Sequence, residues 1–301
     1  MVETRKLAGR DIYPIGFGAM NVSHCYQPRL PDNEGGRVLL AALDLGYTHF
    51  DTAAVYGHGH NEALIGEYLS PRRDEIVLTS KCGIVKDPDT GKRGINNRTD
   101  LIRQSIDETL SLLKTDHLDI FYLHRWDKVT PIEEVVGEMG RLVEAGKVRT
   151  LGLSEVSAKT LRKAHATHPI SAVQSEYSLW TRNPEIAVLE ACREIGATFV
   201  AFSPVARQFL TGKLTAVDGF VMMTFAIQCR GSNLRFMQKT SNSSLSIKRL
   251  PTKRAARRRN WLWLGCSLAE SMLCQFLGHK ASPTRKRTFI PRRWSYLPRS
   301  W

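Results

Sequence analysis

Four side chains that can move or orient a proton follow short apolar runs in the first half of the chain. Asp51 lies near the end of one run and Tyr56 follows it, Lys81 ends the next and His124 ends a third. An ammonium at the end of a buried run needs a partner, and Asp51 is the natural one. A nearby cation favours the phenolate form of a tyrosine, which makes Tyr56 a candidate general acid. With His124 orienting a carbonyl group, the set suits protonation of the carbonyl oxygen while hydride reaches the carbon.

Each of these residues also has an ordinary structural interpretation. An isolated Asp–Lys pair is more often structural than catalytic, and a histidine that ends a strand usually bonds to backbone. A tyrosine before a glycine, as at Tyr56, is commonly a turn residue. Because the four residues fall at the ends of three consecutive apolar runs, we favour an active site over four separate structural roles.

The apolar runs recur along the chain, with helical patterns between them. The seven runs cover residues 15–20, 49–53, 76–81, 118–124, 148–154, 172–177 and 198–203. Nearly continuous apolar character suits parallel strands that are buried on both faces. Seven strand–helix units in series predict an α/β fold, a (β/α)8 TIM barrel, whose catalytic groups lie at the carboxyl ends of the strands.

The charge of the chain is divided unevenly. The 301 residues carry a formal net charge of +14, which invites a nucleic-acid interpretation. Residues 1–220, however, hold 26 basic and 28 acidic residues, whereas residues 221–301 hold 17 basic residues and a single acid, Glu270. We therefore expect two parts: a barrel over 1–220 that holds strands one to seven, and an atypical, poorly ordered basic tail over 221–301.

The first residues and the cysteines indicate the compartment. The polar segment 1–11 has no apolar stretch, so no secretory signal is expected. The six cysteines are scattered and form no C-x-x-C pair, which argues against a disulfide framework or a metal site. Scattered thiols fit a reducing compartment, and we expect a cytoplasmic protein.

Ordered motifs extend this pattern over about residues 5–220. They are Phe50-Asp51-Thr52-Ala53, Tyr56-Gly57, Asn61-Glu62, Thr79-Ser80-Lys81, Asp119, Leu123-His124, Gly146-Lys147-Val148-Arg149, Gly152-Leu153-Ser154-Glu155, Gln174, Glu176-Tyr177-Ser178, Phe202-Ser203-Pro204 and Leu210-Thr211-Gly212. This series resembles the aldo-keto reductase superfamily. Residues 154–168 and 177–182 look most similar to its fungal and bacterial branch with pyridoxal reductase-like and aryl-alcohol dehydrogenase-like members, where roles in secondary metabolism are common.

The resemblance implies a barrel that binds NADP(H) without a Rossmann motif, and Gly16-x-Gly18 indeed lacks the third glycine of a dinucleotide fingerprint. It assigns the catalytic tetrad to Asp51, Tyr56, Lys81 and His124. It assigns the nicotinamide carboxamide to Ser154 and Gln174, and ring stacking to Tyr177. It places the cofactor mouth at Gly18, Ala19 and Met20, and the diphosphate segment at Ser203, Pro204, Val205 and Arg207 with Leu210 and Gly212.

The implied function is NADPH-dependent reduction of an aldehyde or ketone to an alcohol, with Tyr56 as the proton donor. The expected partner is a small carbonyl or alcohol substrate; neither nucleic acid nor a membrane is expected. The alternative is a catalytically impaired or non-catalytic relative: a degraded gene product, or a binding subunit like the potassium-channel β subunits of the superfamily.

The resemblance stops abruptly after Phe220. A family member would continue with an eighth strand and a basic 2′-phosphate site, so we expect the last βα unit to be missing or aberrant. Residues 221–301 hold 12 arginines, 10 serines and four of the six tryptophans, which we interpret as translation in a shifted frame. Two other interpretations stay open: nucleic-acid binding by the basic run 253–259, and a membrane anchor over 261–278.

Overall fold

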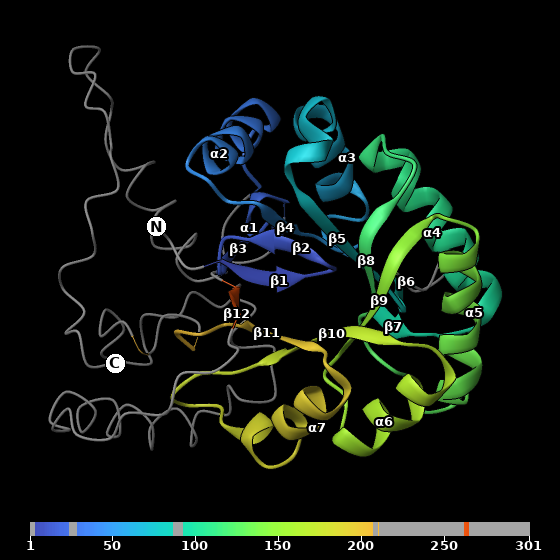
Figure 1. Cartoon of the computed structure of the whole chain (residues 1–301). Helices are drawn as coiled ribbons and strands as arrows, with labels where there is room; N and C mark the ends of the chain where they lie inside the picture. Colours follow the sequence, from blue (N-terminus) through green and yellow to red (C-terminus); the bar gives the residue numbers. More distant parts are fainter. Residues whose placement is uncertain (1–3, 24–28, 87–92, 207–209, 211–261, 265–301) are drawn as a thin grey trace, which may run out of the picture.

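The chain folds into a closed barrel of eight parallel strands (Figure 1). The computed structural model describes residues 4–23, 29–86, 93–206, 210 and 262–264. In their order around the barrel, the strands are β10 (Ile170–Glu176), β11 (Thr198–Phe202), β12 (Leu262–Leu264), β3 (Ile15–Gly18), β4 (His49–Asp51), β5 (Val77–Cys82), β8 (Leu118–Leu123) and β9 (Val148–Ser154). The predicted (β/α)8 barrel is confirmed, and each of the seven apolar runs overlaps one strand.

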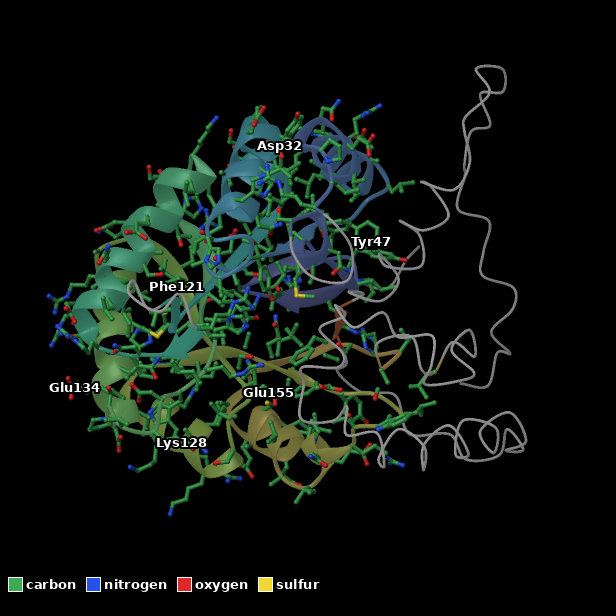
Figure 2. The ribbon with its side chains drawn as sticks, turned by 180° about the vertical axis from the view of Figure 1, so that it is seen from behind. Asp32, Tyr47, Phe121, Lys128, Glu134 and Glu155 are labelled. Atoms are coloured by element: carbon green, nitrogen blue, oxygen red, sulfur yellow. The ribbon has the colours of Figure 1, made fainter. Side chains whose placement is uncertain are left out.

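Helices cover the outside of the barrel (Figure 1). They are α1 (Met20–Ser23), α2 (Asp32–Asp44), α3 (His60–Leu69), α4 (Thr99–Leu113), α5 (Ile132–Glu144), α6 (Ala158–Thr167) and α7 (Val188–Ile195), with 3-10 turns η1 (Ser70–Glu75) and η2 (Asn183–Glu185). Phe121 is buried between β8 and this layer, whereas Glu134 on α5 lies at the outer edge (Figure 2). None of the helices in the described ranges is long and apolar enough to span a membrane.

A hairpin packs into the amino-terminal end of the barrel. Its strands are β1 (Arg5–Leu7) and β2 (Arg10–Ile12), and they pair antiparallel. Leu7 and Ile12 join a buried cluster with side chains from inside the barrel, among them those of Val77, Ile120 and Val200. The apolar end of the barrel is thereby filled, and polar side chains remain at the opposite, carboxyl end of the strands.

A second hairpin, β6 (Ile84–Lys86) with β7 (Arg93–Ile95), follows β5.

The last βα unit was expected to be missing or aberrant, and in the described residues the eighth barrel position is filled by a strand of only three residues, β12. Leu262–Leu264 pairs in parallel with β11 on one side and with β3 on the other. Without it, β3 and β11 would present unpaired backbone groups, which favour pairing with any available strand. These residues lie in the apolar stretch 261–278, for which the sequence leaves a membrane anchor open and predicts no strand. The division at residue 220 and the expected poor order of 221–301 otherwise lie outside the described residues.

Two contacts fix α3 in the outer layer. The buried carboxylate of Glu62 accepts hydrogen bonds from Ser80 Oγ at 2.6 Å and from Thr109 Oγ1 at 2.9 Å, and its burial raises its pKa. Gly66 lets α3 approach α4 so closely that a Cβ there would lie 2.2 Å from the carbonyl oxygen of Leu112. Because backbone cannot yield as a flexible side chain can, only glycine fits at this position.

Replacing Gly66 with alanine is therefore expected to lower the free energy of unfolding by about 1–3 kcal/mol through overpacking. Gly137 in α5 is the matched control, because the nearest atom to its Cβ would be at 3.9 Å. Gly137→Ala is expected to raise stability by about 0.5–1 kcal/mol through helix propensity. Urea unfolding measures both values, and equal effects of the two substitutions would contradict the close α3–α4 approach.

A fully buried histidine lies inside the barrel on β4. The side chain of His49 is inaccessible to solvent, and burial, with a smaller contribution from the Lys81 cation, lowers its pKa to about 4. The unfolded chain binds a proton at this position near pH 6.5. Protonation therefore favours the unfolded state, and stability is lost as the pH falls from 6.5 towards 4.

We expect this one histidine to remove about 2 kcal/mol of stability between pH 7 and pH 5. His49→Gln cannot take up the proton, so its free energy of unfolding is expected to fall less than that of the wild type over this interval. Urea unfolding at a series of pH values measures the difference. Parallel curves for the two proteins would show that His49 does not titrate in this way.

Candidate active site

A buried ion pair joins the ends of two neighbouring strands. Lys81 of β5 and Asp51 of β4 are 1% and 3% exposed. The Lys81 Nζ atom lies 2.5 Å from Asp51 Oδ2 and also donates to the carbonyl oxygen of Thr52 at 2.7 Å. A buried ammonium is tolerated when its charge and its protons find acceptors, and Lys81 has both. The side chains expected to pair are therefore brought together.

Tyr56 lies close to both this cation and His124. The Lys81 Nζ atom is 5.3 Å from the centroid of the Tyr56 ring. The rings of Tyr56 and His124 meet edge to face, with centroids 6.0 Å apart and an interplanar angle of 87°. Residues from the ends of β4, β5 and β8 thus converge on one place, as the sequence predicted for the four groups.

A turn after β4 carries Tyr56, and Asn61 ties that turn to its surroundings. Asn61 Nδ2 donates to the carbonyl oxygen of Ala19 and to Ser23 Oγ, both at 2.8 Å. Its side-chain oxygen accepts from Thr52 Oγ1 at 2.6 Å. Because the Thr52 carbonyl also accepts from Lys81, this amide links the predicted cofactor mouth to the residues around the ammonium.

The second oxygen of Asp51 is held from two sides of the barrel. Asp51 Oδ1 accepts from Thr79 Oγ1 at 2.8 Å and from Gln174 Nε2 at 3.1 Å. Thr79 is on the adjacent strand, whereas Gln174 is on β10, which lies opposite β4 in the closed barrel. The predicted cofactor residue Gln174 therefore contacts the carboxylate of the predicted catalytic pair.

His124 is neutral at physiological pH. Its pKa lies well below 6.5, first because of burial and then because of the cations Lys81 and Arg125. The backbone N–H of His124 donates to the Cys82 carbonyl at 2.9 Å, which fixes the residue at the end of β8. A neutral imidazole carries one N–H, and that group can donate to an oxygen placed beside Tyr56.

The other predicted cofactor residues surround the same carboxyl ends of the strands. Gly18 ends β3, and Ala19 and Met20 follow it. Ser154 ends β9 and accepts from Arg125 at 3.0 Å. Tyr177 follows β10, and its hydroxyl donates to Glu185 at 2.7 Å. Burial and this carboxylate raise the pKa of Tyr177 to about 12.

The predicted diphosphate segment follows β11. Ser203 and Ala206 have left-handed backbone, with φ of 50° and 49°. The N–H of Ala206 donates to the Ser203 carbonyl at 2.9 Å, and that of Leu210 donates to the Val205 carbonyl at 3.2 Å. Left-handed turns of this kind can present backbone N–H groups to an anion. Pro204 lies within the turn, and Arg207 and Gly212 lie outside the described residues.

Sequence reasoning gave no role to two side chains that lie next to the ion pair. Thr79 donates to Asp51, and His49 Nε2 lies 3.3 Å from Thr79 Oγ1. Their signal was the two-residue period of a strand, because His49 precedes Asp51 by two positions and Thr79 precedes Lys81 by two. Each pair therefore shares the face of its strand that points into the barrel.

Comparison with known proteins gives the family. The model of the aldo/keto reductase family matches residues 14–222. The chain is 43% identical over 224 residues to the NADP(+) aldo-keto reductase yakc of Schizosaccharomyces pombe, 73% of this chain and 66% of that protein. It is 42% identical over 208 residues to a probable aldo-keto reductase of Glycine max, 68% of this chain and 59% of that protein. The chain thus spans less than two thirds of the length of these relatives.

Solved structures show the same fold. The glycerol dehydrogenase of Gluconobacter oxydans superimposes with a TM-score of 0.75 at 22% identity, covering 95% of this chain and 99% of that one. An aldo/keto reductase of Klebsiella pneumoniae, solved with NADP and acetate, gives 0.61 at 23% identity, covering 89% and 85%. With a family model that matches most of its length and relatives above 40% identity, the chain belongs to the aldo/keto reductase family.

Proposed function

We propose that this protein reduces a small aldehyde or ketone to the alcohol with NADPH, and that Tyr56 donates the proton. The observation that carries the proposal is the position of the Lys81 ammonium, paired with buried Asp51, at 5.3 Å from the centroid of the Tyr56 ring. A tyrosine donates a proton readily only where a neighbouring charge stabilises the phenolate that it leaves behind. Membership of the family supports the same assignment.

Tyr56, Lys81 and His124 have separate roles at the carbonyl oxygen of the substrate. Tyr56 gives up its phenol proton, and the buried Lys81 cation stabilises the resulting anion. The neutral imidazole of His124 donates a hydrogen bond that orients the oxygen toward Tyr56. Asp51 accepts from Lys81 and so balances the charge of the ammonium when no substrate is bound.

The side chains at the carboxyl ends of β9 and β10 fit a nicotinamide group. A hydroxyl from Ser154, an amide from Gln174 and an aromatic ring from Tyr177 supply polar contacts for a carboxamide and a flat face for a ring. NADPH, when bound, supplies the hydride that reduces the substrate carbon. Gln174 donates one of its two N–H groups to Asp51, and its side-chain oxygen remains to accept from the carboxamide.

The remaining cofactor contacts are assigned by position. Gly18, Ala19 and Met20 line the mouth beside Asp51, since the N–H of Ala19 donates to the Asp51 carbonyl at 2.9 Å. The turn around Pro204, which itself has no N–H, offers the backbone N–H groups of Ser203 and Val205 to the diphosphate, with Arg207, Leu210 and Gly212 beyond it. The name of the Schizosaccharomyces pombe relative and the NADP in the Klebsiella pneumoniae structure support NADP(H) as the cofactor. The buried free thiols of Cys82 and Cys192 agree with a cytoplasmic protein.

A catalytically impaired or non-catalytic protein is the second candidate. The family match ends at residue 222, and the curated relatives extend well beyond the matched length. This candidate requires that residues 221–301 do not complete the cofactor site. Wild-type protein that is folded and monodisperse but oxidises no NADPH would favour this candidate.

Replacing Tyr56 with phenylalanine is expected to lower kcat by about 10²–10⁴-fold, the usual contribution of a general acid. NADPH oxidation with benzaldehyde, followed by absorbance, measures it. Tyr13→Phe is the control and is expected to keep wild-type turnover, because Tyr13 packs against Tyr47 away from the site. Turnover by Tyr56→Phe equal to that of the wild type would exclude Tyr56 as the proton donor.

Replacing Gln174 with alanine is expected to raise the Kd for NADPH about tenfold through loss of one hydrogen bond to the carboxamide. Fluorescence titration with NADPH measures this without turnover. Gln104→Ala is the control, since Gln104 bonds to Glu108 on the exposed face of α4. Unchanged affinity in Gln174→Ala would remove this residue from the cofactor site.

A further inference from the structure

Two buried polar side chains lie on the inward face of β4 and β5 and take no part in the steps above. The strand register places Thr79 directly opposite Asp51, and His49 two residues before Asp51 on the same face. Both side chains are fully buried. Apolar residues fill the neighbouring interior, among them Val77 and Ile120. Two polar groups at this depth therefore call for an explanation.

The hydroxyl of Thr79 has a choice of acceptors. Thr79 Oγ1 lies 2.8 Å from Asp51 Oδ1 and 3.4 Å from the Phe50 carbonyl oxygen. A carboxylate at the shorter distance takes the proton, because hydrogen bonds to charged acceptors are the stronger ones. The oxygen of Thr79 is then left as an acceptor for His49 Nε2 at 3.3 Å.

His49 can make that donation only in one form. Burial keeps the imidazole neutral, with a pKa of about 4, so the ring carries a single N–H. Placing that proton on Nε2 satisfies Thr79 and leaves Nδ1 as a lone pair. Nδ1 is buried and has no hydrogen-bond partner among the described residues, an arrangement that costs stability. An apolar residue would avoid this cost, so stability does not explain the histidine.

The groups around Asp51 show how Thr79 and His49 affect the orientation of its carboxylate. Lys81 on β5 is the cation that faces the carboxylate, Tyr122 on β8 lies across from it with a buried hydroxyl, and Gln174 on β10 reaches Oδ1. With Oδ1 occupied by Thr79 and Gln174, only Oδ2 remains to receive Lys81. The rotation of the carboxylate therefore decides where the ammonium sits relative to the ring of Tyr56.

We propose that Thr79, oriented by His49, is a positioning residue: its hydroxyl holds the Asp51 carboxylate so that Oδ2 places the Lys81 ammonium against Tyr56. The inference rests on the proposed function, because it concerns the proton donor of that reaction. Neither residue touches substrate or cofactor. They act through Asp51 and Lys81, and their loss should alter the chemical step more than substrate binding.

The test compares variants that keep or remove each donor. Thr79→Val removes the hydroxyl and Thr79→Ser keeps it, whereas His49→Phe removes the Nε2 donor and His49→Gln offers an amide N–H near its place. Thr109→Val is the matched control, because this equally buried hydroxyl donates to the carboxylate of Glu62 outside the barrel. Each protein is assayed for kcat and KM with benzaldehyde. Its tyrosine ionisation is followed by ultraviolet absorbance, with Tyr56→Phe subtracted to isolate Tyr56.

We expect Thr79→Val to lower kcat by about tenfold to hundredfold, the loss of one hydrogen bond to a charged group, with KM changed less than about threefold. The ionisation midpoint of Tyr56 should rise, because the cation is held less firmly beside the phenol. Thr79→Ser should restore both values to within about threefold of the wild type. His49→Phe should act in the same direction as Thr79→Val, and His49→Gln should reverse part of the loss.

Wild-type kcat and an unchanged Tyr56 midpoint in Thr79→Val would overturn the inference, as would equal losses in Thr79→Val and Thr109→Val. If Thr79→Val does not fold, kcat and the Tyr56 midpoint of His49→Phe and His49→Gln are compared in its place. Wild-type values in His49→Phe would then overturn the inference. Failure of the proposed function would look different: the wild type would then turn over no aldehyde. The ionisation of Tyr56 would still report whether Thr79 positions Lys81.

Discussion

The buried charge of Lys81 is the constraint on which the rest of the site depends. Removing an ammonium from water costs several kcal/mol unless acceptors replace the water, and breaking one partner of a buried pair typically costs about 3–5 kcal/mol. Asp51 and the Thr52 carbonyl meet this requirement only because β4 and β5 are neighbours in the register that sets Asp51 opposite Thr79. The ion pair therefore depends on the pairing of β4 with β5 in this register.

Closure of the barrel adds a second condition. Asp51 Oδ1 bonds to Gln174, and the two residues stand on strands with three others between them in either direction around the barrel. The bond forms only when the barrel is closed, because closure sets the distance between opposite strands. β12 completes that circumference with three residues, joined to β11 and β3. The part of the chain that resembles its relatives least therefore contributes to the geometry of the part that resembles them most.

The strands and the convergence of Asp51, Tyr56, Lys81 and His124 could be predicted from the sequence, since buried parallel strands are continuous apolar runs whose carboxyl ends meet. The Asp51–Gln174 bond could not, because a contact across a barrel depends on its radius and not on any local pattern. His49 and Thr79 carried a readable signal in the two-residue period, but a polar residue inside a strand has no evident partner until the register is known. The N-terminal hairpin was missed because its short strands contain charged residues, and β12 was missed because its apolar stretch lies outside the strand–helix alternation of residues 15–203.

The interior of the barrel is apolar towards its amino-terminal end and polar towards its carboxyl end. His49 lies at the boundary between the two regions. Towards the amino-terminal end, Leu7 and Ile12 of the hairpin pack with Val77 and Val200. Towards the carboxyl end, Thr79, Asp51 and Lys81 follow one another in hydrogen-bond contact. The apolar packing excludes water from the amino-terminal side of Asp51 and Lys81. Their charges therefore act through a medium of low dielectric constant, where interactions between charges are strong. The hairpin that fills the barrel is therefore as much a part of the electrostatics of Tyr56 as the ion pair beside it.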